Sequence, residues 1–393
     1  MTRAREWIAA AFGALLVLFF ATERGLAEFR VNTNTPGDQV PAQVASLENG
    51  GFIVVWHSSF ASGSNVSGQR FDATGARVGS EFKITPDTDT TTYSPSVVGL
   101  TGGGFVVTWN SLGGPRADGT YFVRGFGQLY DSAGVPTGTN FKITPPDPNG
   151  RDISAGSPVA LRNGGFVVNW AGERTGAWAN IYTAAGTLVR SFRLTRGFYG
   201  FSLFALTHAG FLSLLQSSSS GQPIYGQRYS LNGRTEGSQF TIGYQGYFPS
   251  VASLQDGGFV LVWRPGDPDS PSEDIWGQRY DSSANLVGAQ FKINKTPVPG
   301  LRAQPVVSAL KSGGFVVVWQ AVGQNGSDVF AQRFDRTSAR VGGAIRLNAA
   351  GFVGDDSYPW VAGLTGGGFA ATWESGDSGS PGDGIDIYGD VVR

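Results

Sequence analysis

The sequence predicts an all-β fold built from seven repeats of one four-stranded unit. Three observations lead to this prediction. A phrase of the form GGFVVxW recurs along the 393 residues, each unit carries four short apolar runs, and no stretch keeps a 3.6-residue apolar period. The composition agrees, because 59 glycines and 12% aromatic residues suit short strands joined by tight turns, while 15% charged residues are too few for a disordered chain.

The recurring phrase places seven unit centres 45 to 61 residues apart. The centres are Phe52, Phe105, Phe166, Phe211, Phe259, Phe315 and Phe369. Four strands in about 50 residues is the size of a β-propeller blade, whereas an immunoglobulin-type domain needs about 100 residues. We therefore predict that residues 28–393 form a single seven-bladed β-propeller of four-stranded blades.

The elements of a unit follow in a fixed order, which we label runs A to D. Run A is short, as in PSVVGL (95–100), and run B is the GGFVVxW phrase. Run C resembles DIWGQRYD (274–281), and run D resembles EFKIT (81–85). Each run is short, rich in Val, Phe, Ile and Trp, and bounded by Gly, Asp or Pro, which indicates strands. A glutamine recurs in run C, and we interpret it as a half-buried amide that satisfies backbone groups; a ring of ligand-binding amides stays open as the alternative.

The two ends of the predicted domain complement each other. Residues 28–33, EFRVNT, read as a run D with no A, B or C before it, and the seventh unit has A, B and C but no D. We predict that residues 28–33 pair with residues 388–392 and complete the last blade. Such closure removes an open sheet edge, which would otherwise invite aggregation.

Residues 1–27 read as a signal peptide. Arg3 and Arg5 precede a fourteen-residue apolar run, 8–21, that is too short to span a bilayer, and small residues follow up to Ala27. We predict cleavage after Ala27 and a secreted protein, extracellular or periplasmic, with no membrane span in the mature chain; an uncleaved anchor stays open as the alternative. The absence of cysteine excludes disulfides and thiolate metal sites. We expect a monomer.

The predicted strand order separates two rims. The A–B and C–D links are tight, whereas the B–C and D–A links are long and variable and fall on one face, which we call the loop-bearing rim. Long loops on a rigid scaffold commonly carry binding. We predict ligand-binding residues among the aromatic residues near these loops and among the variable residues that follow the run-B Trp; ordinary loop packing stays open. The candidates are Trp360, Trp178, Tyr121, Tyr93, His57, Arg264 and Glu374.

Trp360 follows Pro359 in an innermost strand, so we expect it near the mouth of the central channel. Acidic residues also gather on the loop-bearing rim, and Ca²⁺ prefers six to eight oxygen ligands. The only cofactor we consider is therefore Ca²⁺, although the D-x-D-x-D-G spacing is absent and a merely solvated acidic rim stays open. The candidate ligands are Asp267, Asp269, Asp274, Asp377, Asp383 and Asp386.

Signatures of enzymes are few. The two histidines, His57 and His208, lie in different units, which argues against a Ser-His-Asp triad or a His-rich zinc site. The sialidase pattern S-x-D-x-G-x-T-W is absent. A carboxylate pair for glycoside hydrolysis stays open, because the sequence does not give the separation of two carboxylates. The net charge of −1 offers no basic excess for nucleic acid.

The combined phrase DGGFVLVW…DIWGQRYD…LVGAQFKIN (256–294) resembles repeats of large secreted or surface proteins of bacteria, which often also carry hemolysin-type (RTX) calcium-binding nonapeptides. The resemblance covers nearly all of residues 28–393 and implies an exported propeller used for adhesion or recognition. The nonapeptide G-G-x-G-x-D is absent, so its calcium sites are not carried over. Units three and four depart from the pattern, with ANIYTAAG (179–186) and FSLFAL (201–206).

The sequence thus leads to one main hypothesis for function, a non-enzymatic propeller that binds a glycan or cell-surface polymer on its loop-bearing rim. The alternatives are a protein-interaction scaffold or adhesin module that binds an extracellular protein, and a carbohydrate-active hydrolase. Repeated sugar sites would give binding at several blades, whereas one protein partner would occupy one contiguous patch.

Overall fold

The structure is a computed structural model. It describes residues 28–60, 63–86, 91–115, 121–145, 152–172, 176–195, 200–216, 224–242, 246–265, 274–295, 304–323, 326–349, 354–376 and 384–393. The predicted signal peptide, 1–27, lies outside the described residues. Across the described ranges, no helix has the length and hydrophobicity needed to cross a membrane.

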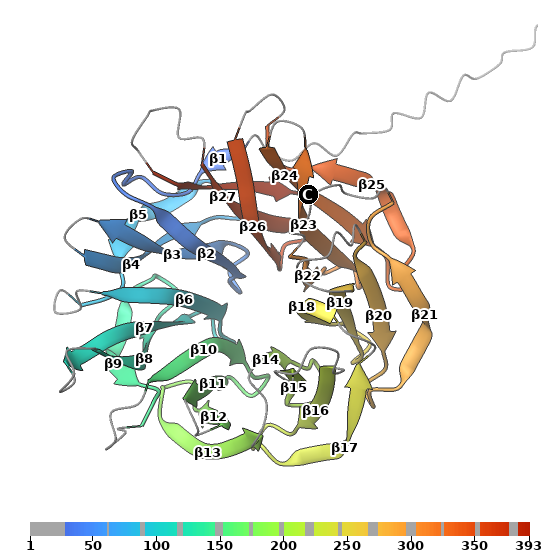
Figure 1. Ribbon diagram of the computed structural model, residues 1–393, viewed down its shortest axis with the longest axis horizontal. Coiled ribbons are helices and arrows are strands. Elements are labelled where there is room, and N and C mark those ends of the chain that lie inside the picture. Colours follow the sequence, from blue (N-terminus) through green and yellow to red (C-terminus); the bar gives the residue numbers. More distant parts are fainter. Residues whose placement is uncertain are drawn as a thin grey trace, which may run out of the picture.

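The described residues form five four-stranded antiparallel sheets that follow one another along the chain (Figure 1). The first sheet holds β2 (Gln39–Ser46), β3 (Phe52–Phe60), β4 (Gly63–Phe71) and β5 (Arg77–Lys83). The second holds β6 (Thr92–Gly99), β7 (Phe105–Pro115), β8 (Tyr121–Tyr130) and β9 (Pro136–Lys142). The third holds β10 (Ile153–Ala160), β11 (Phe166–Gly172), β12 (Gly176–Tyr182) and β13 (Leu188–Thr195). The fourth holds β14 (Gly200–Ala205), β15 (Phe211–Gln216), β16 (Ile224–Tyr229) and β17 (Thr235–Ile242). The fifth holds β18 (Gly246–Ser253), β19 (Phe259–Pro265), β20 (Trp276–Tyr280) and β21 (Leu286–Lys292).

A sixth sheet of eight strands contains the rest of the described chain. Its strands are β22 (Val306–Ala309), β23 (Phe315–Gly323), β24 (Gly326–Phe334), β25 (Arg340–Arg346), β26 (Gly354–Gly363), β27 (Phe369–Ser375), β28 (Asp386–Val392) and β1 (Phe29–Arg30). The described residues therefore form six sheets where seven were predicted. The cause is a parallel pairing of two residues, Gly326 with Gly354 and Ser327 with Asp355, which joins β24 to β26.

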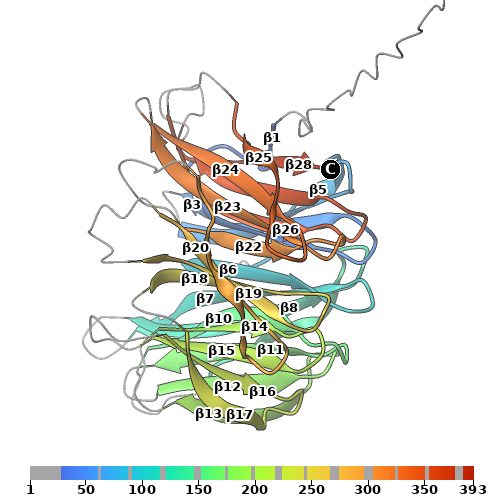
Figure 2. The ribbon, with the colours of Figure 1, turned by 90° about the vertical axis from the view of Figure 1, so that its right-hand side faces the viewer.

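The predicted order of runs within a unit is confirmed. Run A is the edge strand beside run B, and runs C and D follow outward, as in β2-β3-β4-β5. The run-A strands β2, β6, β10, β14, β18, β22 and β26 surround a common axis (Figure 1). In the view turned by 90°, the sheets are seen beside one another with their strands running across the thickness of the ring (Figure 2). The fold is therefore all-β and propeller-like.

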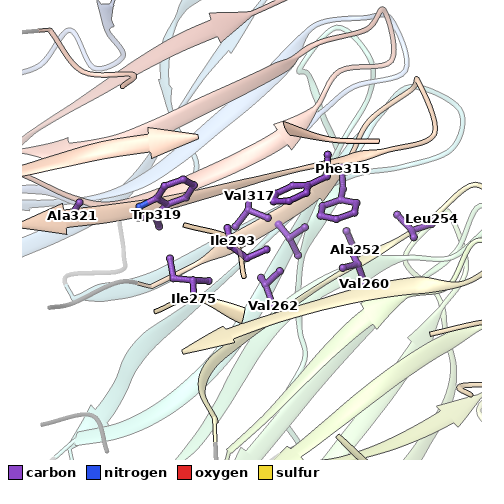
Figure 3. Packing of buried hydrophobic residues seen from close by; sticks show 12 residues of the cluster. Ala252, Leu254, Val260, Val262, Ile275, Ile293, Phe315, Val317, Trp319 and Ala321 are labelled. Carbon is purple, nitrogen blue, oxygen red and sulfur yellow. The ribbon is translucent and has the colours of Figure 1, made fainter. Parts of the chain in front are cut away.

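The hydrophobic core lies between neighbouring groups of four strands. One cluster joins Val260 and Val262 of β19 to Phe315, Val317 and Trp319 of β23 (Figure 3). Equivalent clusters lie between the other neighbouring groups. Within six groups, the phenylalanine of run B stacks on the aromatic ring opposite it in run C, with ring centroids 4.7 to 5.1 Å apart. The repeated phrase GGF thus fixes a repeated packing unit.

The predicted pairing of the two chain ends is confirmed. Phe29 pairs with Gly389 and Arg30 with Tyr388 in an antiparallel ladder, and the Val31 N–H donates to the carbonyl of Ile387 at 2.7 Å. The partners are thus residues 387–389, so the ladder ends short of the predicted Val392. The side chain of Val31 is fully buried.

The recurring glutamine of run C has the structural role expected from its position. Gln278 Nε2 donates to the carbonyl oxygens of Arg279, Val287 and Gly288 at 2.9, 3.3 and 3.2 Å. The amide thereby satisfies carbonyls at the register shift between β20 and β21. The same kind of contact is made by Gln69, Gln128, Gln227 and Gln332.

Candidate binding site at the axis

A bulge in the inner strands shapes the mouth of the axis. The ladders of β6, β18 and β26 shift register at an X-Pro step, where Ser94, Phe248 and Tyr358 have φ angles of 51°, 54° and 50°. Proline disfavours the right-handed α region for the residue before it, and here that residue takes the left-handed region, which is costly for a bulky side chain. Phe248 and Tyr358 are 41% and 40% exposed. The bulges therefore leave the rings of Phe248 and Tyr358 exposed to solvent.

Below these bulges, the inner strands bring equivalent positions together. In each group of four strands, one residue of the inner strand faces the axis. It pairs with the run-B residue that comes directly before the closing Trp or Leu. These residues are Gln43, Ser96, Ser202, Ser250, Val306 and Trp360, with Ser157 at the register shift of β10. All of them line one cavity of about 480 Å³. We call them the axial ring.

The axial ring is chemically uneven. Ser96, Ser157, Ser202 and Ser250 follow one another around the axis and form a hydroxyl-bearing wall, whereas Val306 and Trp360 form an apolar wall. Ser96 Oγ donates to Gln43 Oε1 at 2.6 Å, and Ser250 Oγ accepts from the Val307 N–H at 3.1 Å. Ser157 and Ser202 are exposed within the cavity. Of the described residues that line the cavity, none is ionisable.

Asn169 adds a polar group beside the hydroxyl wall. It is 4% exposed, lines the cavity, and its Oδ1 has no hydrogen-bond partner within the described residues. A buried amide oxygen without a partner is unfavourable. Gly156 makes room for it, because a Cβ at Gly156 would lie 2.5 Å from both terminal atoms of the Asn169 amide. The site is therefore built around this amide.

The predicted residues that follow the run-B Trp are buried or half-buried and do not line this cavity. Arg264 and Glu374 are 1% and 5% exposed, and the Arg264 guanidinium carbon is 5.9 Å from the Phe248 ring centroid. Burial raises the pKa of Glu374 to about 8. Burial also lowers the pKa of His57, whose Nδ1 lies 2.8 Å from the carbonyl oxygen of Val40. These three predicted residues lie in different groups of strands, and none lines the axial cavity.

The predicted aromatic residues fall into three environments. Trp360 lines the axial cavity, as expected. Trp178 stacks on Trp170 at a centroid distance of 5.3 Å, within the core between the second and third sheets. Tyr93 is half-buried. Its pKa is raised mainly by this burial and also by the nearby Asp152 carboxylate. The side chain of Tyr121 lies outside what the structure describes.

The predicted metal ligands are only partly described. Asp267, Asp269, Asp377 and Asp383 lie outside the described residues. Asp274 forms an ion pair with Lys292 at 2.7 Å, and the buried Asp386 accepts a hydrogen bond from Asn32 Nδ2 at 2.6 Å. Within the described ranges, no three Asp, Glu or His side chains are grouped so as to hold a metal ion.

The sequence interpretation did not identify Asn169, Ser157, Ser202 or Phe248. One signal was present in the sequence, because Pro recurs in run A at Pro95, Pro249, Pro305 and Pro359. A proline in an inner strand indicates a bulge or an edge, and here it marks the level of the cavity mouth.

Comparisons with known proteins show the fold. No family model and no curated protein matches the chain. A protein of unknown function from Dyadobacter fermentans is 13% identical, with 94% of this chain and 99% of that chain covered at a TM-score of 0.52. A mutant of the NanB sialidase from Streptococcus pneumoniae is 11% identical, with 94% and 70% covered at 0.51. A mutant of AofleA from Arthrobotrys oligospora is 12% identical, with 82% and 90% covered at 0.50. These likenesses agree with a propeller-like arrangement of the sheets.

Proposed function

We propose that this chain is an exported seven-bladed β-propeller that recognises a glycan or surface polymer on its loop-bearing rim, without converting it. The axial cavity carries this proposal. An aromatic ring, a wall of hydroxyls and a buried amide suit a sugar, because apolar C–H faces pack on aromatic rings while sugar hydroxyls pair with polar groups. Sites for small molecules commonly combine an apolar surface with a few convergent polar groups in this way.

The seven-bladed interpretation rests on the inner strands and on the core. Seven run-A strands contribute to the lining of one cavity, and each neighbouring pair of four-stranded groups encloses its own core cluster in the described residues. The eight-stranded sheet divides naturally at the two-residue parallel bridge between β24 and β26. On this interpretation the sheet is two blades in contact at the rim.

The comparisons fit a glycan ligand without implying a sialidase. A protein named as a sialidase has a similar fold, but this sequence lacks the S-x-D-x-G-x-T-W pattern. Recognition without turnover is favoured because the described residues that line the cavity include no ionisable side chain. General acid and base catalysis needs such a group within hydrogen-bond reach of the substrate.

A glycan array with the purified protein tests the proposal. The buffer contains calcium, and a parallel array contains a chelator, because the sequence left Ca²⁺ open as a cofactor. Binding to a defined group of sugars supports recognition, and loss of that binding in chelator assigns a role to calcium. Silence across a broad array overturns the glycan proposal and favours a protein partner.

A carbohydrate-active hydrolase is the second candidate, because of one residue. A general acid requires a carboxyl whose pKa is raised by burial, and Glu374 has this property. Release of reducing ends from a glycan bound on the array, abolished by Glu374→Gln with the melting temperature retained, would establish the hydrolase. A bound glycan that stays intact excludes this role for Glu374.

A further inference from the structure

The proposed function leaves open what the axial cavity selects and how many ligands the chain binds. The repeats suggest several equivalent sugar sites, but the positions of the axial ring are not equivalent. Ser157 and Ser202 belong to the third and fourth units around the ring, whereas Trp360 belongs to the last. In a ring of seven units, the last unit lies across the axis from the third and fourth, and Figure 1 shows β26 facing β10 and β14 across the centre.

Resting on the proposed function, we propose that the axial cavity holds one neutral sugar ring per chain. The apolar face of the sugar packs on Trp360, its hydroxyl edge faces Ser157 and Ser202, and one of its hydroxyls binds the side-chain amide of Asn169. A cavity of about 480 Å³ lies within the range of about 300–1,000 Å³ that is typical of small-molecule sites.

Asn169 determines which edge of the sugar enters. Its side-chain amide lines the cavity and its Oδ1 has no hydrogen-bond partner in the described residues, so a sugar hydroxyl, which can both donate and accept, can pair with the amide. A site whose buried polar group would be left unpaired rejects ligands that lack the matching group. Asn169 is therefore the specificity-determining residue of the site.

The described residues that line the axial cavity also favour an uncharged ligand. An anionic sugar would enter a cavity with no lysine, arginine or histidine among its described lining residues. Arg264, whose guanidinium carbon is 5.9 Å from the ring centroid of the lining residue Phe248, does not itself line the cavity. A charge that loses water without gaining a partner is strongly disfavoured. We therefore expect neutral sugars to bind and N-acetylneuraminic acid to be rejected.

The test uses saturation-transfer-difference NMR on the purified protein. The probes are the methyl glycosides of glucose, galactose, mannose and N-acetylglucosamine, with N-acetylneuraminic acid as the anionic probe. Transfer should be strongest for protons on one face of a single neutral sugar. Trp360→Ala should weaken binding at least about tenfold, a loss of about 1.4 kcal/mol, and Trp360→Phe should restore most of it. Tyr358→Ala is the matched control, because Tyr358 is an exposed aromatic residue of the same strand that does not line the cavity.

Asn169→Ala is tested against deoxy sugars. The variant should bind the best neutral glycoside about three- to tenfold more weakly, the usual effect of one hydrogen bond. One deoxy analogue should show the same weakening on the native protein and no further loss on the variant, because interacting partners are not additive. The melting temperature of each variant is measured as a control, to check that the variant is folded.

The outcomes separate the two proposals. If the array finds a glycan whose binding is unchanged by both Trp360→Ala and Asn169→Ala, the axial site is overturned and recognition elsewhere on the rim stands. If N-acetylneuraminic acid binds as well as the neutral sugars, the charge argument is overturned. A silent array together with silent NMR overturns both proposals.

Discussion

At the scale of single residues, equivalent positions of one repeat carry different chemistry. Of the residues that directly follow the run-B Trp, Asn110, Arg264, Gln320 and Glu374 are buried, whereas His57 and Ala171 are half-buried. Asn110 shows how such a residue is satisfied, because its amide donates to the carbonyl of Ala155 and accepts from its N–H at 3.0 and 2.8 Å. The sequence shows that this position varies. The sequence does not show that these side chains lie between neighbouring sheets. Their position depends on how each run-B strand is aligned with the inner strand of the next group.

Glu374 should make stability depend on pH. Its pKa is about 8 in the folded chain and about 4.3 when unfolded, so between these values the folded state holds a proton that the unfolded state has lost. The free energy of unfolding therefore falls as pH rises from about 4.3 to about 8. Asp390, whose pKa burial raises to about 7, acts in the same direction. Glu374→Gln should match the native melting temperature at pH 5 and exceed it at pH 9.

The control for this prediction is Glu48→Gln, the same change at an exposed site. Melting curves at pH 5 and pH 9 of the three proteins make the comparison. Parallel pH profiles for the native protein and Glu374→Gln would contradict the argument.

Ala284 and Ser338 occupy a turn position that other units give to glycine. Their φ angles are 67° and 69°, close to those of Gly75 and Gly134 in the equivalent turns. A left-handed conformation costs a residue with a Cβ about 1–2 kcal/mol, partly offset by the greater flexibility of glycine when unfolded. Ala284→Gly should therefore raise the free energy of unfolding by about 0.5–1 kcal/mol. Ser283→Gly, at the preceding position, should lower it; equal effects in denaturant melts would refute the assignment.

At the scale of the element, the segment 29–32, which begins with β1, is short but makes many contacts. Asn32 Nδ2 donates to Asp386 Oδ1 at 2.6 Å, and Asn32 Oδ1 accepts from the Ile387 N–H at 2.9 Å. The ring of Phe29 packs on Phe71, at a centroid distance of 5.2 Å, so the strand also contacts the first sheet. β1 thus links the last group of strands to the first.

Val31→Ala should destabilise the protein by about 2 kcal/mol, because Val31 is fully buried. Val78→Ala is the control, because Val78 lies on the outer strand β5 and is 37% exposed; it should cost much less.

Deletion of residues 28–34 should abolish soluble folded protein. A deletion variant with an unchanged melting temperature would show that closure by β1 is dispensable.

The elements were the most predictable part of the fold. The GGF phrase, the run-C aromatic residue and the turn residues are local signals, and they placed runs A to D and the pairing of residues 28–33. The axial ring was less predictable, because the place of Ser157 depends on the register shift between Ala155 and Pro158. The junction of β24 with β26 was not predictable either, because it depends on how two neighbouring units approach each other at Ser327 and Asp355.

At the scale of the whole molecule, repetition builds the scaffold and departures from repetition build the site. Each neighbouring pair of units shares the same kind of core, yet around the axis the seven positions differ enough to give one hydroxyl wall and one apolar wall. Units three and four, which depart from the repeat in sequence, supply Asn169, Ser157 and Ser202. Of these three residues, Ser202 lies within a departing stretch, 201–206.

The most direct test is the binding stoichiometry. Isothermal titration calorimetry with the strongest glycan from the array measures how many ligands one chain binds. We predict one ligand per chain, with the heat lost in Trp360→Ala and kept in Tyr358→Ala. Binding of several equivalent ligands per chain would contradict recognition at the axis. Binding of a single ligand that is unchanged in Trp360→Ala would contradict it as well.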